Sequence, residues 1–456
     1  MHPAAKRPGR AIRNRLIAAS CTLLSAAAAR AGDGGADPAA PAEDGQTIVD
    51  TALAYYAENN GRVRAIEPIV NLRHDFGDER ILALKLTFDS LSGATPNGAV
   101  PSTRPQTFAS PSGHSLTAAP QTYTTASGQT SVISSPIYTV AAGQLPMDPN
   151  YHDQRLAVSG TYQLPVSGLT QATLGGDLSY EHDFLSVSGN GAIAHDFNQK
   201  NTTLSLGGNL EFDMVRPIGG APVAGSDYTL FEKQGDHTKH DANVVLGLTQ
   251  IMTRRWLADV NVSYDQLNGY LNDPYKIVSL VDSLGSVTGY LYEKRPDRRS
   301  RTSVFLENRL ALDRASAGLT LRYMSDDWGI HSETAQLKLR WSNPQRDRYL
   351  EPQLRWYRQT AANFYTPWIS SGGTGYITNA SADERLGAFH AVTWGLKYAA
   401  RFPDDSGGDG SELSLRAEFY RQTPDRRLAG PGALSGLNLY PGLQAVLVQV
   451  EWRFGY

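Results

Sequence analysis

The sequence LQAVLVQVEWRFGY, residues 443–456, alternates apolar and polar side chains to the end of the chain. One face carries Val446, Val448, Val450, Trp452, Phe454 and Tyr456. A period of two is typical of a β-strand with one apolar face. Strands in soluble proteins usually have about 5 to 6 residues, whereas a tilted strand of about ten can cross a bilayer. The segment therefore predicts a membrane-spanning strand.

The same alternation recurs along the chain. In 300–313, Val304, Leu306 and Leu310 share one face, and Glu307 and Arg309 share the other. Counting such segments predicts about sixteen strands, near 48–58, 62–74, 79–89, 154–164, 169–182, 184–197, 201–213, 239–252, 255–269, 300–313, 315–325, 330–342, 348–361, 384–400, 411–422 and 443–455. The sequence thus predicts an all-β fold, an antiparallel transmembrane β-barrel over residues 48–456.

The lengths of the connections agree with this interpretation. Outer-membrane barrels have short periplasmic turns at one end and longer external loops at the other. With a periplasmic N-terminus, every second connection is expected to be a short turn, and the long ones all fall on the opposite side, near 90–153, 214–238, 270–299, 362–383 and 423–442. A soluble propeller or sandwich is the alternative, but those folds rarely sustain ten-residue alternation in nearly every strand.

Composition excludes several classes of protein. The 456 residues have a net charge of -3, which argues against a nucleic-acid partner. No segment after the N-terminal region approaches the roughly 18 consecutive apolar residues of a transmembrane helix. The single cysteine, Cys21, lies in the N-terminal apolar run, so thiol nucleophiles, zinc-thiolate sites and disulfides are not expected in the mature chain.

The N-terminus predicts export. Basic residues between Lys6 and Arg15 precede an apolar run, Leu16 to Ala29, and a small-residue cleavage site, so residues 1–31 are interpreted as a signal peptide. A lipoprotein cleaved before Cys21 is the alternative, although only about five apolar residues precede that cysteine. Residues 32–47 are small, acidic and contain proline, which predicts a disordered periplasmic lead.

Several stretches resemble a known family. YYAENNGRVRAIEPIV, LALKLTFDSLSGATPNGAVP, DLSYEHDFLSVSGNGAIAHDFNQKNTTLSLG and FDMVRPIGGAP are similar to the bacterial family catalogued as domain of unknown function 3570. The resemblance covers most of the mature chain and implies an outer-membrane barrel. It implies no activity and no catalytic residues.

The C-terminal strand also resembles that of bacterial outer-membrane proteins, in which alternating apolar residues ending in an aromatic are read by the barrel-assembly machinery. The resemblance implies an assembly signal at Val450, Trp452, Phe454 and Tyr456. The other interpretation is a lipid-facing strand with an aromatic girdle. Both place the strand in the same membrane.

If the apolar set faces lipid, the alternate residues line the lumen, and their charges divide into two groups. An acidic wall is expected from Asp177, Glu181, Glu211, Asp213, Asp241, Asp259 and Asp265. A mostly basic wall is expected from Arg301, Arg309, Arg322, Lys338, Arg340, Arg355, Lys397 and Arg416, interspersed with glutamates. Such a division resembles the transverse field of general porins. Alternatively, the charges pair across the lumen and only stiffen the wall.

The stretch 90–153 is long, nearly uncharged and rich in Ser, Thr, Pro and Gly. Loops of this length in a compact domain are usually functional or disordered. It can fold inward as a constriction or lie outside as a cap, and we expect the constriction.

Other chemistry has weaker support. Asp89, Asp148 and Asp153 offer hard oxygens to calcium, but without EF-hand spacing, and the metal site is left unassigned. His237 and His240 beside Asp236 and Asp241 are interpreted as an exposed loop rim. No GxSxG, HExxH, P-loop or dinucleotide motif stands in a fitting context, so no enzyme activity and no cofactor are expected.

The sequence therefore predicts a passive channel or transport component in the outer membrane of a Gram-negative bacterium, in contact with outer-membrane lipid. One alternative is a non-conducting scaffold for a periplasmic or surface partner, whose identity the sequence does not give. The other is an enzyme with its site at the outer rim.

Overall fold

The computed structural model describes residues 45–456, except 111–120, 125–129, 134–136, 218, 374–377, 404–409, 426–429 and 456. The predicted signal peptide and most of the predicted lead, residues 32–44, lie outside the described residues. The last residue of that lead, Thr47, is already the first residue of β1.

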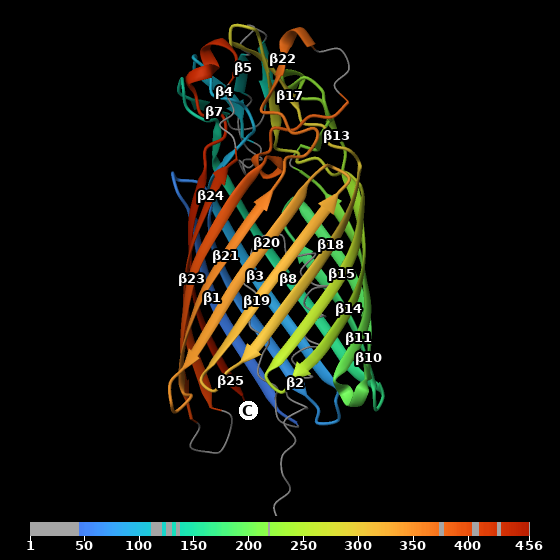
Figure 1. Cartoon of the computed structure of the whole chain (residues 1–456). Coiled ribbons are helices and arrows are strands. Elements are labelled where there is room, and N and C mark those ends of the chain that lie inside the picture. The colour runs from blue at the N-terminus through green and yellow to red at the C-terminus, as the bar shows by residue number, and fades with distance from the viewer. Residues whose placement is uncertain are drawn as a thin grey trace, which may run out of the picture.

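The chain forms a closed barrel of sixteen strands, each antiparallel to its neighbours (Figure 1). In order around the barrel the strands are β1 (Thr47–Glu58), β2 (Arg64–Asp75), β3 (Ile81–Pro96), β8 (Met147–Ser167), β9 (Thr170–Tyr180), β10 (Phe184–Phe197), β11 (Thr202–Val215), β14 (His237–Thr253), β15 (Trp256–Gly269), β18 (Arg298–Ala311), β19 (Ala315–Asp326), β20 (His331–Ser342), β21 (Arg348–Gln359), β23 (Phe389–Phe402), β24 (Ser411–Pro424) and β25 (Leu443–Gly455). The barrel closes where β1 pairs with β25. The transmembrane barrel and its strand number predicted from the sequence are confirmed.

The two faces of each strand differ in polarity. Leu174, Leu210 and Leu246 are about half exposed on the outer surface, as are the corresponding apolar residues of the other strands. Because alternate side chains point to opposite faces, the polar residues between them point into the lumen. The exterior thus forms the apolar band that lipid requires.

Long connections gather at one end of the barrel and short turns at the other (Figure 1). The short turns include the 3-10 turn η1 (Asn198–Lys200), which joins β10 to β11. The chain ends beside these turns, at the bottom of Figure 1. By the rule for outer-membrane barrels, the end with short turns is periplasmic and the other is external.

The long connections fold into an external cap. Its strands are β4 (Gln106–Ala109), β5 (Gln121–Thr124), β6 (Thr130–Ile133), β7 (Ile137–Val140), β12 (Ala221–Pro222), β13 (Lys233–Gln234), β16 (Ile277–Val281), β17 (Val287–Tyr292) and β22 (Trp368–Ser370). Its 3-10 turns are η2 (Tyr228–Leu230), η3 (Ser371–Gly373), η4 (Glu384–Leu386) and η5 (Gly432–Gly436). Among the described residues, no helix is long and apolar enough to cross a membrane.

The cap has apolar cores of its own. The largest packs Phe108 and Tyr138 from the 90–153 stretch against Tyr228, Tyr290 and Tyr292 from other connections. The Phe108 and Tyr290 rings meet edge to face, with centroids 5.2 Å apart. Loops that leave different sides of the barrel therefore share one packed core.

Two glycines allow two cap loops to pass each other. Gly285 and Gly432 both have positive φ, 82° and 48°. A Cβ on Gly432 would lie 2.0 Å from the carbonyl oxygen of Leu284, and one on Gly285 would lie 2.2 Å from that of Pro431. Only residues without a side chain fit this crossing.

Three sequence expectations need correction. The strand expected from 384 begins at Phe389, because 384–386 form η4. β3 and β8 continue well past 89 and 154, with Pro96 opposite Met147, so they rise above the rim as a paired arm. The inward constriction expected of 90–153 is wrong for its described part, since β4, β5 and β7 lie above the barrel (Figure 1).

Candidate functional site

A cavity of about 1600 Å³ joins the external cap to the lumen. Residues on inward strand faces, such as Glu67, Asp177 and Gln336, line it together with cap residues such as Tyr365 and Asp383. Fifteen carboxylate side chains line it against nine lysines and arginines. The ionisable groups that line the cavity are therefore net acidic.

One side of the cavity is formed by an ion-pair network between cap loops, in which Glu293 and Asp383 are buried and Arg385 is exposed. We term this network the cap clamp: Asp273, Glu293, Arg295, Ser381, Asp383 and Arg385. Arg385 lies 2.6 Å from both Asp273 and Asp383. Arg295 lies 2.8 Å from Asp383 and 2.7 Å from Glu293. The network joins the loops after β15, after β17 and before β23.

Asp383 is the centre of the cap clamp. Its side chain accepts a hydrogen bond from the backbone N–H of Arg385 at 3.0 Å and so caps η4. Burial raises the pKa of the Asp383 carboxyl, but the charges of Arg385, Arg295 and Lys276 outweigh burial and hold the pKa well below its usual range. The Asp383 carboxyl is therefore charged at neutral pH.

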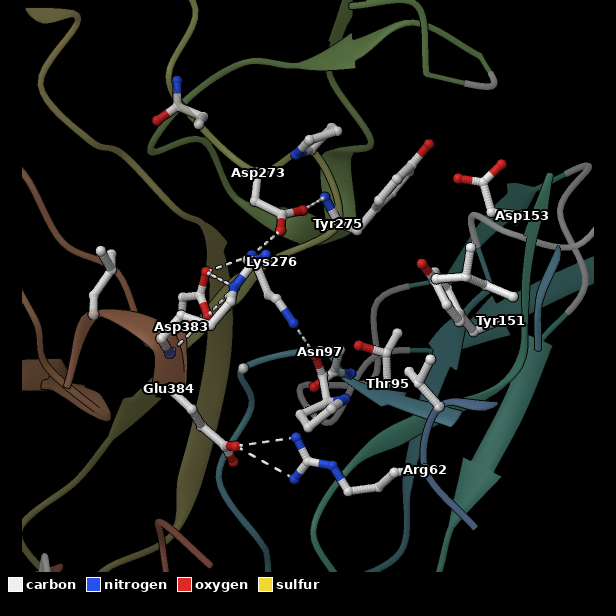
Figure 2. A pocket seen from close by; sticks show the side chains of 18 of the residues that line it. Arg62, Thr95, Asn97, Tyr151, Asp153, Asp273, Tyr275, Lys276, Asp383 and Glu384 are labelled. Atoms are coloured by element: carbon white, nitrogen blue, oxygen red, sulfur yellow. Dashed lines mark hydrogen bonds and ion pairs between the residues drawn. The ribbon is translucent and has the colours of Figure 1, made fainter. Parts of the chain in front are cut away.

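A second set of contacts ties the barrel rim to the cap. Arg62, in the turn after β1, lies 3.2 Å from Glu58 and 3.4 Å from Glu384, and Figure 2 shows its guanidinium pointing toward Glu384. Lys276 donates to the backbone carbonyl of Pro96, at the end of β3. These contacts fix the cap over the mouth of the barrel.

Three acidic residues gather across the cavity from the clamp, and we term Asp153, Glu181 and Asp183 the mouth carboxylates. One oxygen of each lies within 4.8 Å of the others. Tyr275 donates to Asp183, and Tyr151 and Tyr275 line the cavity beside them (Figure 2). Burial, and then the charge of Asp153, raise the pKa of Glu181, just beyond the end of β9, to about 8.

The residues expected on the acidic wall all occupy inward positions of β9, β11, β14 and β15 or, for Glu181, the hairpin that follows β9. Asp177, Glu211 and Asp241 stand in one cross-strand row, bridged by Ser188 of β10. Asp213 pairs with Lys239 at 3.1 Å. Asp259 instead accepts from Thr249 at 2.6 Å, nearer the periplasmic end.

The residues expected on the basic wall occupy inward positions of β18 to β24, and most meet a nearby carboxylate. The ion pairs are Arg309 with Glu307 at 2.6 Å, Arg340 with Glu351 at 2.6 Å, Lys397 with Glu451 at 3.1 Å and Arg416 with Glu418 at 3.4 Å. Arg322 donates to Ser303 at 3.4 Å and is exposed to the lumen. Arg355 lines the cavity. Lys338 makes no ion pair with any described residue.

The two walls meet between β15 and β18. Arg301 of β18 lies 2.6 Å from Asp265 and 3.7 Å from Asp241, so the two carboxylates share one guanidinium. The field that the two walls would produce remains a prediction.

The expected assembly signal faces outward. Val450, Trp452 and Phe454 are exposed on β25, whereas Glu451 and Arg453 between them are half-buried in the lumen. Tyr456 lies outside the described residues. The outward positions of Val450, Trp452 and Phe454 agree equally with an assembly signal and with a lipid-facing girdle.

The calcium ligands considered from the sequence do not converge. Asp89 pairs with Arg155, and Asp148 accepts from Ser110 at 2.8 Å. Asp153 instead joins Glu181 and Asp183. His237 stacks on Tyr270 with ring centroids 4.6 Å apart, and His240 is on the outer face of β14.

Sequence reasoning missed the cap clamp entirely. Its residues lie in connections without periodicity, so no pattern marks them as neighbours. The only local signal was Asp383 two residues before Arg385, the spacing of an aspartate that caps a short turn.

Comparisons with known proteins place the chain in a family. The family model described as "Protein of unknown function (DUF3570)" matches residues 13–454. No curated protein matches the chain.

Similar solved structures include a mutant ferric enterobactin receptor, PfeA, from Pseudomonas aeruginosa, at 10% identity and a TM-score of 0.40. That match covers 90% of this chain, which spans only 60% of the receptor. The CymD monoaromatic hydrocarbon channel is 7% identical over 91% of this chain and 89% of its own, with a TM-score of 0.38. OccK2 (OpdF) from P. aeruginosa is 8% identical, and the match covers 91% of this chain and 98% of OccK2, with a TM-score of 0.38.

Proposed function

Because the chain belongs to the DUF3570 family, whose description assigns no function, we propose from its own geometry that it is a passive outer-membrane channel. Small polar solutes enter through the capped external mouth and cross a lumen with an acidic and a basic wall. The proposal places the protein in the outer membrane of a Gram-negative bacterium and gives it no catalytic step.

The continuous cavity carries the proposal. A scaffold barrel needs no solvent space, whereas here one cavity of about 1600 Å³ is lined by both cap residues and inward strand residues. Sixteen-stranded barrels are wide enough for an aqueous channel unless something fills them. Between the ends of β3 and β8, strands β4, β5 and β7 of this stretch lie in the cap, above the barrel.

The distribution of charge supports selectivity. Inward positions of β9 to β15 carry the acidic wall with Lys239 as a basic exception, whereas β18 to β24 carry the basic wall. Ion pairs within the basic wall reduce its field without removing its excess of positive charge. In a water-filled constriction with low-dielectric walls, such a division orients dipolar solutes.

Single-channel conductance of the refolded mature protein in a planar bilayer tests the proposal. Replacing 97–145 by a short turn between β3 and β8 removes one side of the cap and should raise the conductance. Removing only the hairpin of β5 and β6, at the top of the cap in Figure 1, is the matched control and should change it little.

A folded barrel that never conducts would contradict the proposal. Heat-modifiable mobility on a gel verifies folding in each variant. A non-conducting folded barrel would favour the scaffold, or the rim enzyme if substitutions of rim serines or histidines abolished a hydrolytic activity.

A further inference from the structure

The acidic wall continues upward to the mouth and forms one track. The mouth carboxylates are its outermost layer. Asp213 follows, and the row of Asp177, Glu211 and Asp241 lies one inward position deeper. Inward positions on a strand repeat every two residues, about 6.6 to 6.8 Å, so acidic side chains follow one another at regular steps.

In the track, two aspartate oxygens accept from no N–H or hydroxyl donor of the described residues. They are Oδ1 of Asp213 and Oδ1 of Asp241, on side chains only 1% and 8% exposed. Both residues line the cavity. Buried carboxylate oxygens are normally satisfied, so both oxygens can accept hydrogen bonds from a cationic donor that enters the cavity.

The track already holds one alkylammonium group of the chain. The Lys239 ammonium lies 3.1 Å from Oδ2 of Asp213 and 4.9 Å from the centroid of the Phe184 ring. An aromatic face beside a carboxylate suits an organic cation, because the ring attracts the charge while the carboxylate accepts its hydrogen bonds. Tyr151 and Tyr275 offer the same combination beside the mouth carboxylates (Figure 2).

We propose that this acidic track is a binding site for aliphatic polyamines, whose ammonium groups bridge successive carboxylate layers from Glu181 to Asp241. Each ammonium has three donors, which can satisfy the unpaired oxygens of Asp213 and Asp241. The methylene segments lie along the aromatic faces at the mouth. The proposal rests on the proposed channel, because the solute reaches the track through the same cavity.

Asp241→Asn is the most selective variant. Asp241 lies 3.7 Å from Arg301, which retains Asp265 at 2.6 Å, so the substitution removes a track carboxylate without leaving that arginine unpaired. Glu418→Gln is the matched control, because Glu418 lines the same cavity from β24, outside the track. Each variant replaces one carboxyl group by an amide of nearly the same size.

The experiment measures spermidine binding to the full refolded chain in detergent by calorimetry, and spermidine block of conductance in a bilayer. We expect Asp241→Asn to weaken both by roughly tenfold, the usual scale for losing a charged hydrogen-bond partner, and Glu418→Gln to change them less than twofold. Tyr151→Leu should weaken the binding of spermidine more than the binding of Mg²⁺, because a hydrated metal ion makes little use of the ring face.

The outcomes separate this proposal from the channel. Conductance without spermidine binding, or equal weakening by Asp241→Asn and Glu418→Gln, overturns the polyamine site and leaves the channel intact. If spermidine binds and the variants have the expected effects, but the folded barrel does not conduct, the polyamine site is supported and the channel proposal is wrong. If Mg²⁺ binds as tightly as spermidine, the track is a general cation funnel and the polyamine assignment is wrong.

Discussion

At the scale of single residues, burial and neighbouring charge set the state of the external mouth. Glu181 illustrates this, because burial and the charges of Asp153 and Asp183 raise its pKa while the charge of Arg155 lowers it. Tyr151 and Tyr275 on the same side carry no charge at neutral pH, since burial raises the pKa of Tyr275 above its ordinary value. Glu181 at the external mouth thus holds a proton that it loses as the pH rises.

This predicts pH-dependent selectivity. With a pKa of about 8, Glu181 is mostly protonated at pH 7 and mostly charged at pH 9, so preference for K⁺ over Cl⁻ should rise across that interval. Reversal potentials in a KCl gradient measure it. Glu181→Gln should remove most of the rise, and a rise that persists in this variant would assign the titration to another group.

At the scale of elements, periodicity predicts the barrel strands because lipid imposes an apolar outer face on each. The expected 184–197 and 443–455 coincide with β10 and β25. The sequence pattern did not predict the cap strands, because they are short and pack against other loops, as Phe108 packs against Tyr290. The cap clamp was not predicted either, because the ion pairs that join its loops, Arg295 with Asp383 and Arg385 with Asp273, connect residues 88 and 112 positions apart.

The outward aromatic residues of β25 lead to a prediction about assembly of the barrel. If the assembly machinery reads this strand, Phe454→Ala should lower the yield of folded barrel in outer-membrane fractions severalfold while leaving refolding in detergent nearly unchanged. Comparison of the two yields by gel mobility checks it. Phe402→Ala, on the outer face of β23 near the same end, is the control. Equal loss in both variants would indicate a girdle alone.

At the scale of the whole molecule, the sequence predicts which residues face the lumen but not how their charges combine. Two basic residues of the same strand, β20, show this. Arg340 of β20 meets Glu351 of β21 at 2.6 Å, whereas Lys338 has no such partner among the described residues. Partners on neighbouring strands depend on register, and register follows from turn geometry that a single sequence leaves open.

Lys338 should therefore contribute more to the positive wall than its paired neighbours. Lys338→Gln is expected to raise the K⁺ over Cl⁻ permeability ratio by roughly twofold, because a lumen charge acts on ions within a Debye length. Lys338→Arg keeps the charge and should leave the ratio unchanged. Reversal potentials measure both, and identical shifts would show that side-chain size, not charge, is responsible.

The seam between β1 and β25 has a consequence for biogenesis. The first and last strands of the chain pair over eleven residue positions, so the cylinder cannot seal until the last segment has been delivered. A chain truncated before β25 would leave two exposed sheet edges, which lipid does not tolerate. The ends of β1 and β25 also meet at the periplasmic rim, so a circularly permuted gene with a short linker there should yield the same cylinder.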